Sequence, residues 1–243
     1  MEKDLTKLVI AIDGPAGSGK STVGRIIAEK LGLTYIDTGA MYRAVTLLKI
    51  RNNISLEKNP DKLIELTNSM NLELLPAESI NGSSDKFQKV ILNGIEVSKE
   101  IRSKEVSQSV SEVSAIPEVR TKLVSLQQKM GEAGGVIMDG RDIGTTVFPK
   151  ANLKIFLVAS SEERAKRRLK QEAQIQSNAI NINEEDLKSV QKEIERRDEI
   201  DRNRKVSPLR QAEDAILIQT DKLSIDEVVQ EIESLSKKTL TKI

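Results

Sequence analysis

Residues 14–21 form a Gly-rich stretch, Gly-Pro-Ala-Gly-Ser-Gly-Lys-Ser, whose residue types and spacing are those of a phosphate-binding loop. Apolar residues over 8–12 predict a buried strand before it, and their helical spacing over 22–31 predicts a helix after it. Glycines let successive backbone N–H groups point at phosphate oxygens, and the helix N-terminus adds its dipole. We therefore expect this stretch to bind a nucleoside triphosphate through Gly14, Pro15, Ala16, Gly17, Ser18, Gly19, Lys20, Ser21 and Thr22.

Two residues at the end of this loop carry its chemistry. Lys20 is expected to reach the β- and γ-phosphates and is the first candidate catalytic residue, and the Ser21 hydroxyl is expected to ligate Mg²⁺. The chain has no His and no Cys, which excludes an imidazole or thiolate zinc site, a Ser–His triad and a Cys nucleophile. Any metal must be a hard cation on oxygen ligands, and Mg²⁺ fits that description.

A second stretch, Asp-Thr-Gly-Ala-Met-Tyr-Arg at 37–43, follows a predicted strand over 33–37 and opens a predicted helix over 40–50. Arg43 is a candidate bidentate clamp for a phosphate, and Tyr42 is a candidate to pack on a base. The alternative is an ordinary helix start with Thr38 as its N-cap and Arg43 in solvent. Spacing alone leaves both interpretations open.

A third stretch, Val-Ile-Met-Asp-Gly-Arg-Asp at 136–142, is an apolar strand that ends in an aspartate. In phosphate-loop enzymes this pattern is typical of a partner for Mg²⁺ or water, here Asp139. Gly140 relaxes the turn, so that Arg141 and Asp142 project at the strand end. The alternative is a plain turn, in which Asp-Gly is common.

A fourth stretch is the charged segment 193–204. Residues of one helix face fall at positions i, i+4, i+7, i+11 and i+14, namely Val190, Ile194, Arg197, Asp201 and Arg204. An apolar stripe that continues as Arg–Asp–Arg suits a mobile arm that closes over phosphates and a sugar hydroxyl. The more common interpretation of such a charged segment is a surface helix with salt bridges along its exposed face. A further basic helix after Ser160 shows a capping-box pattern with Glu163, so we rank its arginines low.

The composition narrows the class of protein. The 243 residues include 38 Lys+Arg and 37 Asp+Glu, a net charge of +1, and only 2% aromatic residues. This balance argues against a general nucleic-acid-binding surface and against stacking platforms for single strands. The chain has no apolar run of 18 residues and its N-terminus lacks the apolar core of a signal peptide, so we expect a cytoplasmic protein that does not bind a membrane.

Strands and helices alternate along most of the chain, which predicts an α/β fold: a P-loop NTPase core whose parallel β-sheet is flanked by helices on both faces. Further strands are predicted at 136–139, 153–158 and 215–219, and further helices near 103–114, 117–132, 161–174, 184–204 and 224–236, with a polar loop over 174–183. Short apolar runs at 71–75, 89–92 and 95–97, with Asn93-Gly94 between the last two, predict a small antiparallel β insert. Ligands bind at the carboxyl ends of the strands in such sheets.

The arginines of these stretches outnumber what one nucleotide requires, which favours two phosphorylated substrates in one cleft. Lys, Arg and Mg²⁺ would stabilise the charge of a transferred phosphoryl group. One alternative is a small-molecule kinase with a sugar or acid acceptor, against which the surplus arginines speak. Another is a GTP-binding switch, but the Asn-Lys-x-Asp tetrapeptide that usually reads guanine is absent.

Taken together, the chain resembles the bacterial cytidylate kinase family over nearly its whole length. The segments that carry the resemblance are 14–21, 37–43, Ile-Arg-Ser at 101–103, Asp-Gly-Arg-Asp-Ile-Gly-Thr-Thr-Val-Phe-Pro at 139–149, Arg-Asp-Glu-Ile-Asp-Arg-Asn-Arg at 197–204 and Ser-Pro-Leu at 207–209. The resemblance implies transfer of the γ-phosphoryl group of ATP to CMP or dCMP. It also implies a core at about 1–40, 134–160 and 205–243, a monophosphate-binding region with the β insert at about 41–133, a helical lid at about 161–204, and a monomer.

The resemblance also assigns roles to single residues. Arg43, Arg141 and Arg204 would hold the CMP phosphate, and Arg197 and Asp201 would contact the ribose and the closed lid. The cytosine edge would be read by Ser111, Arg120 and Asp142, with Tyr42 beside the base and Thr38 as a small hydroxyl residue of the site. Besides Lys20, the catalytic set is Arg141, Asp142, Arg197 and Arg204.

Overall fold

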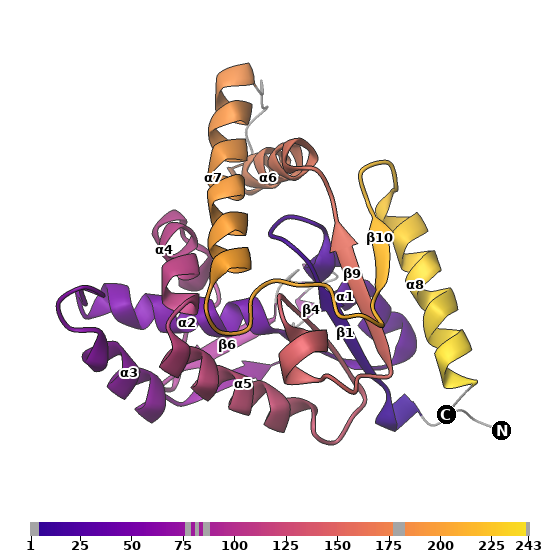
Figure 1. The fold of residues 1–243 in the computed structure, drawn as a ribbon, viewed down its shortest axis with the longest axis horizontal. Coiled ribbons are helices and arrows are strands. Elements are labelled where there is room, and N and C mark those ends of the chain that lie inside the picture. The colour runs from indigo at the N-terminus through magenta and orange to yellow at the C-terminus, as the bar shows by residue number, and fades with distance from the viewer. Residues whose placement is uncertain (1–4, 76–78, 81–82, 85–87, 177–182, 242–243) are drawn as a thin grey trace.

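The computed structural model describes residues 5–75, 79–80, 83–84, 88–176 and 183–241. Its centre is a five-stranded parallel sheet with the strand order β10-β9-β1-β8-β2 (Figure 1). The strands are β1 (Val9–Asp13), β2 (Thr34–Asp37), β8 (Val136–Gly140), β9 (Leu153–Val158) and β10 (Ile216–Gln219). This sheet confirms the predicted α/β core.

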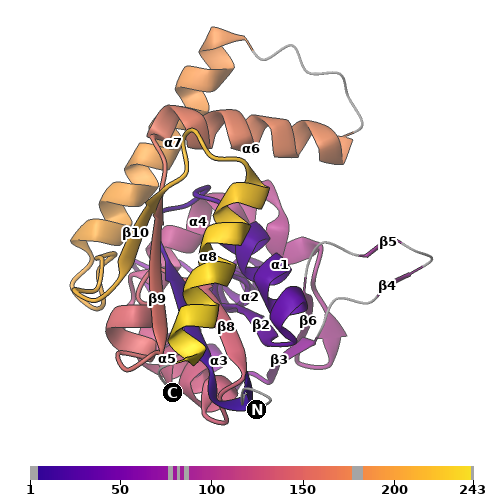
Figure 2. The same cartoon turned by 90° about the vertical axis from the view of Figure 1, so that its right-hand side faces the viewer.

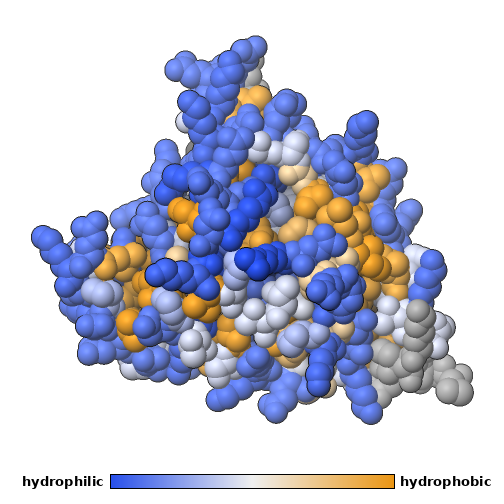
Figure 3. Space-filling view, viewed as in Figure 1, coloured by the Kyte–Doolittle hydropathy of each residue, from blue (hydrophilic) through white to orange (hydrophobic). Residues whose placement is uncertain are grey.

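The middle strand β1 is covered on both faces, which explains its unbroken apolar sequence. Helices α1 (Lys20–Leu31) and α8 (Ile225–Leu240) pack on one face through residues such as Ile27 and Ile232 (Figure 2). The opposite face is covered by α5 (Pro117–Gly131) and by a tight π-helical turn at Ile143–Val147. The edge strand β10 leaves Ile216 and Leu217 exposed, and Figure 3 shows apolar residues gathered over this edge.

A second hydrophobic cluster lies beside the sheet, between residues 38 and 131. It is built by α2 (Thr38–Arg51), α3 (Pro60–Ser69), α4 (Lys104–Ser114) and α5, together with an antiparallel sheet of β3 (Leu72–Leu75), β6 (Lys89–Leu92) and β7 (Ile95–Glu96). Asn93 and Gly94 join the last two strands with φ angles of 51° and 79°, the left-handed pair that a two-residue hairpin needs. The predicted insert and hairpin are thus confirmed, while α3 was not predicted.

Short elements complete this part of the chain. A two-stranded ribbon of β4 (Ser79–Ile80) and β5 (Ser83–Ser84) belongs to neither sheet. One-turn 3₁₀ helices are found at Leu5–Lys7 and Glu100–Arg102. Within the described ranges, no helix is long and apolar enough to cross a membrane.

Two long helices stand over the carboxyl end of the sheet, where β9 leads directly into α6 (Figure 1). These are α6 (Ser161–Gln176) and α7 (Glu184–Asn203). The Asn183 side chain caps α7 by accepting from the amide of Asp186, and Ser160 Oγ accepts from the amide of Glu163 at 3.2 Å. The predicted loop over 174–183 was wrong at its start, because α6 continues to Gln176, and 177–182 lie outside the described residues.

Candidate active site

The phosphate-binding loop joins β1 to α1 at the carboxyl end of the sheet, as predicted. Gly14, Gly17 and Gly19 have φ angles of 146°, 77° and 97°, which side chains rarely adopt. A Cβ on Gly14 would also lie 2.0 Å from the carbonyl oxygen of Leu157, so glycine is required there. The curled loop leaves its backbone N–H groups at the N-terminus of α1, where an anion binds well.

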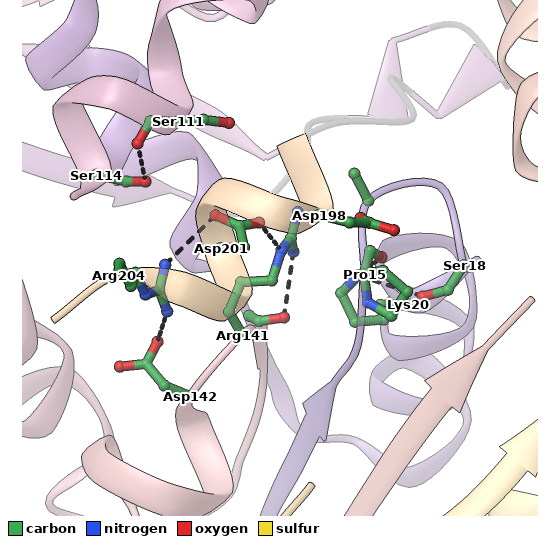
Figure 4. Close-up of polar contacts among 12 residues, drawn as sticks. Pro15, Ser18, Lys20, Ser111, Ser114, Arg141, Asp142, Asp198, Asp201 and Arg204 are labelled. Carbon is green, nitrogen blue, oxygen red and sulfur yellow. Dashed lines mark hydrogen bonds and ion pairs between the residues drawn. The ribbon is translucent and has the colours of Figure 1, made fainter. Parts of the chain in front are cut away.

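Lys20 is the first residue of α1 and folds back over this loop. Its Nζ donates to the carbonyl oxygen of Pro15 at 2.6 Å and to Ser18 Oγ at 3.3 Å (Figure 4). Burial lowers the pKa of Lys20 to about 7, and the nearby Arg141 acts in the same direction. The carboxylates of Asp139 and Asp13 act in the opposite direction, and phosphate oxygens close to the ammonium group would favour its charged form in the same way.

Ser21 and Asp139 meet beside the loop. Ser21 Oγ donates to Asp139 Oδ2 at 2.7 Å, and Tyr35 Oη donates to the other carboxylate oxygen at 2.8 Å. Burial raises the pKa of Asp139 to about 6, and the charge of Asp37 adds to that shift. A cation at this place would favour the ionised carboxylate, and hydroxyl and carboxylate oxygens are ligands that suit Mg²⁺. Tyr35 was not among the predicted site residues.

These oxygens would supply only part of a coordination shell. Among the residues that the structure describes, no group of three or more Asp, Glu, His or Cys side chains is placed to hold a metal ion. Mg²⁺ characteristically keeps several waters and takes one or two protein oxygens together with substrate phosphates. The donor set around Ser21 therefore fits a Mg²⁺ ion that is bound with the nucleotide.

Several guanidinium groups lie close enough to one another to shift each other's pKa values. Burial lowers the pKa of Arg43 to about 9, and Arg197 is the next cause. Burial and then Arg141 lower the pKa of Arg197, whose buried Nε has no hydrogen-bond partner in the described part of the chain. Arg43 itself donates to Ser107 Oγ at 2.8 Å rather than lying in solvent. Mutually repelling cations that are partly removed from water form a site for an anion such as a phosphate group.

Helix α7 is tied to the end of β8 by an ion pair. Arg141 Nε donates to Asp201 Oδ2 at 2.8 Å, and Arg204 Nη1 lies 3.5 Å from Asp201 Oδ1 (Figure 4). Burial acts to raise the pKa of Asp201, but Arg141 and Arg204 together bring it below its ordinary value. The predicted face of the 193–204 helix therefore does point into the crevice, and Figure 3 shows strongly hydrophilic residues gathered at the middle of this side of the molecule.

Asp142 lies at the foot of the crevice, beyond the end of β8. It is 4% exposed and accepts from Arg120 Nη2 on one oxygen and from Arg204 Nη2, at 3.4 Å, on the other. The guanidinium of Arg120 lies 5.3 Å from the centre of the Tyr42 ring, so it has a carboxylate on its edge and an aromatic ring on its face. Burial raises the pKa of the Tyr42 hydroxyl to about 12, and this group stays neutral.

The remaining predicted residues lie on α1, α2 and α4. Thr38 is buried and donates to the carbonyl oxygen of Asp139 at 2.6 Å, while Asp37, not Thr38, is the N-cap of α2. Ser111 lies on α4, and its carbonyl oxygen accepts from Ser114 Oγ (Figure 4). Thr22 and Ser21 are exposed at the start of α1. The structure thus brings the candidate residues of four separate sequence stretches to one edge of the sheet.

Two buried residues that position the site were not predicted. Asp13, just before the loop, accepts from the backbone amides of Ile143 and Gly144 at 2.8 and 2.7 Å and so holds the turn that follows Asp142. Arg164, in the helix whose arginines were ranked low, donates to the carbonyl oxygen of Ala16 in the phosphate loop. The aspartate before the loop is visible in the sequence, but its partners are backbone amides, which sequence does not mark.

Comparisons with known proteins agree with this geometry. The family model described as cytidylate kinase matches residues 10–238. A cytidylate kinase of Enterococcus faecalis is 50% identical over 95% of this chain and 96% of its own length, and one of Carboxydothermus hydrogenoformans is 48% identical over 92% and 94%. An uncharacterized protein from Eubacterium ventriosum, 12% identical, matches the fold with a TM-score of 0.51 over 96% of this chain and 99% of its own. The chain belongs to the cytidylate kinase family.

Proposed function

We propose that this protein transfers the γ-phosphoryl group of ATP to CMP or dCMP and releases ADP and CDP or dCDP. Family membership and relatives named cytidylate kinase support this activity. The observation that carries it most directly is the group of buried guanidinium groups of Arg43, Arg141 and Arg197, one of which lies near enough to Lys20 to lower its pKa. Two neighbouring groups of cations suit two phosphorylated substrates.

On the donor side, the loop residues 14–22 would hold ATP. Their backbone N–H groups would cradle the phosphates, and the ammonium group of Lys20 would contact the β- and γ-phosphates. Ser21, supported by Asp139, would hold Mg²⁺, which supplies neutralisation of the phosphate charge when it is bound. The hydrogen bond from Lys20 to the Pro15 carbonyl keeps the ammonium group over the loop before the nucleotide arrives.

On the acceptor side, Arg43, Arg141 and Arg204 would hold the CMP phosphate, and Arg197 and Asp201 would contact the ribose. Guanidinium forks suit this role because they donate two parallel hydrogen bonds to phosphate oxygens. The Nε of Arg197, which has no hydrogen-bond partner among the described residues, provides a buried donor that a ligand would satisfy. Asp201 holds Arg141 in place through a hydrogen bond of 2.8 Å.

The base would be read at the foot of the crevice by Asp142, Arg120 and Ser111, with Tyr42 and Thr38 nearby. Cytosine offers an exocyclic amine donor beside the N3 and O2 acceptors, so a carboxylate with Arg and Ser donors is complementary to it. Because Asp142 and Arg120 are buried, a base of the wrong pattern would place a mismatched donor or acceptor against them, away from water.

In the transfer step, an oxygen of the CMP phosphate forms a bond to the γ-phosphorus of ATP. The bond between that phosphorus and the β–γ bridging oxygen breaks, and the electron pair leaves with ADP. Negative charge spreads over the equatorial oxygens of the transferred group, where Lys20, Arg141, Arg197 and Arg204 would stabilise it. The step needs positioned cations and no general base on an imidazole, which agrees with a chain that has no His.

We propose that donor binding, acceptor binding and closure of the site are carried out by three regions of one chain. Residues at about 1–40, 134–160 and 205–243 would form the core, about 41–133 the monophosphate-binding region, and about 161–204 the lid that excludes water. We further propose a monomer that acts in pyrimidine nucleotide metabolism in the cytoplasm. Light scattering of the purified protein tests whether it is a monomer.

A coupled ADP-release assay with ATP and Mg²⁺ tests the activity. CMP, dCMP, UMP, AMP, GMP and shikimate are offered in parallel, and GTP replaces ATP in a control. We expect fast turnover with CMP and dCMP and little with the others. Turnover with shikimate alone, or slow GTP hydrolysis without an acceptor, would contradict the proposal.

A further inference from the structure

Arg164 lies where the lid meets the phosphate loop. It is 4% exposed, its Nε donates to the carbonyl oxygen of Ala159 at the end of β9 at 3.0 Å, and its Nη1 donates to Ala16 in the loop at 3.1 Å. The packing is close as well, since a Cβ on Gly17 would lie 3.2 Å from Arg164 Cβ. One guanidinium group therefore fixes the start of α6 against the loop that would hold the donor phosphates.

The same guanidinium also binds the second lid helix. Its Nη1 and Nη2 donate to the two carboxylate oxygens of Asp198 on α7 at 3.1 and 2.6 Å. Both side chains are 4% exposed, so the pair is removed from water on both sides. A bidentate pair of this kind fixes orientation as well as distance.

Asp198 lies on the same helix as the residues proposed to contact the ribose. It follows Arg197 directly and precedes Asp201 by one turn. Figure 4 shows Asp198 on the side of this helix toward the phosphate loop, and Asp201 toward Arg141 and Arg204. A shift of Asp198 relative to the loop would therefore move the proposed ribose and phosphate contacts with it.

We propose that Arg164 and Asp198 are positioning residues that couple donor binding to acceptor binding. Phosphates in the loop would order its backbone, including the segment with the Ala16 carbonyl, and the ordered loop would hold Arg164. Arg164 in turn holds Asp198 and sets α7 in the place where Arg197 and Asp201 meet CMP. The inference rests on the proposed function for the identity of the two ligands.

The coupling is measured as a ratio of two dissociation constants. Isothermal titration calorimetry gives the Kd of CMP for the full chain without nucleotide and with saturating adenylyl imidodiphosphate and Mg²⁺. By linkage, the same factor must apply to the analogue when CMP is present. We expect CMP to bind roughly 5- to 150-fold more tightly with the analogue, the usual range of such couplings.

Three variants locate the coupling. Asp198→Asn removes one charge of the pair, and we expect the ratio to fall toward 1. The double variant Arg164→Met/Asp198→Leu replaces the whole pair by apolar side chains, an exchange that buried ion pairs often tolerate without loss of stability, and it should also abolish the coupling. Glu199→Gln changes the exposed carboxylate next in sequence and should keep the wild-type ratio.

Thermal unfolding followed by circular dichroism shows which variants are folded. If Asp198→Asn does not fold, the double variant decides the question. A folded double variant that keeps the wild-type ratio, or a loss of coupling in Glu199→Gln, would overturn the inference. A wild-type ratio of 1 would overturn it too while leaving the proposed function intact, whereas a wild-type protein that does not bind CMP at all would contradict the proposed function.

Discussion

Ser21 and Asp139 are 118 positions apart in the chain, yet Ser21 Oγ donates to Asp139 Oδ2 at 2.7 Å. The contact follows from the order of strands in the sheet. Because β1 and β8 are parallel neighbours, helix α1, which follows β1, begins beside the carboxyl end of β8. The hydroxyl and the carboxylate together make an oxygen-lined place next to the phosphate loop. Such oxygens suit the Mg²⁺ ion that we propose is bound with ATP.

The first prediction concerns this contact. Asp139→Asn removes the charge behind Ser21, and we expect the Mg²⁺ concentration for half-maximal activity to rise, or kcat to fall, by roughly 10- to 100-fold, the usual cost of losing a group that orients a metal ligand. Tyr35→Phe is the matched control, because it removes only the hydrogen bond to the other oxygen of Asp139. A Mg²⁺ titration of Asp139→Asn that overlays the wild-type curve would show that the ion binds elsewhere.

The second prediction concerns the choice of base. Asp142→Asn replaces an acceptor by a side chain that also donates, and uracil offers an acceptor where cytosine offers a donor. We expect the ratio of kcat/KM for CMP to that for UMP to fall on the order of 10- to 100-fold, which corresponds to the ~1–3 kcal/mol of a specific base contact.

Stability needs its own check in this variant. Arg120 would be left buried with its charge unpaired, so a loss of about 3–5 kcal/mol of unfolding free energy is expected. Assays are therefore run well below the melting temperature of the variant. An unchanged ratio in folded protein would move the base-reading site away from Asp142.

The third prediction concerns the proton on Lys20. Burial lowers its pKa to about 7, and bound phosphates would raise that pKa again. Binding of ATP at pH about 7.5 should therefore take up between about half a proton and one proton on Lys20. Calorimetry in buffers of different ionisation enthalpy measures this uptake, and Lys20→Met should lack it. Equal uptake by both proteins would exclude Lys20 as the group that titrates.

The fourth prediction concerns Asp13. Burial raises its pKa from 3.8 to about 7, and Asp142 acts in the same direction. The folded protein thus binds a proton more tightly than the unfolded chain, so this group makes the free energy of unfolding fall as pH rises from about 4 to about 7. Each tenfold difference in proton affinity between the folded and unfolded chain corresponds to about 1.4 kcal/mol.

Asp13→Asn isolates that contribution. Urea unfolding at several pH values should give a shallower decline for the variant between pH about 4 and about 7, and parallel curves above about 7. Asp139 titrates in both proteins and largely cancels in the comparison. Curves that stay parallel across the whole range would contradict the assignment of the raised pKa to Asp13.

The sequence predicted most of the core because each signal there is local. Apolar runs of β-branched residues mark strands such as β1, helical periodicity marks helices such as α1, and Asn93-Gly94 marks a hairpin by its need for positive φ angles. Helix α3 was missed although Pro60 stands at its first position, because its apolar face is short and packs against other helices of the region. The π-helical turn at Ile143–Val147 was missed because the acceptor that holds it, Asp13, is 130 positions away.

In the site, too, residues with a local sequence signal were predicted and residues held by distant partners were missed. Lys20, Arg141 and Arg204 were predicted from motifs and spacing, and the structure brings them to one crevice. Arg164 was ranked low because a capping pattern explained part of its helix, yet its partners come from three other segments of the chain. Such pairing depends on how α6 and α7 pack against each other and against the phosphate-binding loop, which local sequence does not encode.

We propose that this protein moves a phosphoryl group from one nucleotide to another. The most direct test is to separate the products of a reaction with ATP, CMP and Mg²⁺ by anion-exchange chromatography. We expect CDP and ADP in equal amounts, with no inorganic phosphate beyond the background without enzyme. Formation of ADP and inorganic phosphate without CDP would show that water, and not CMP, is the acceptor, and the proposed function would be wrong.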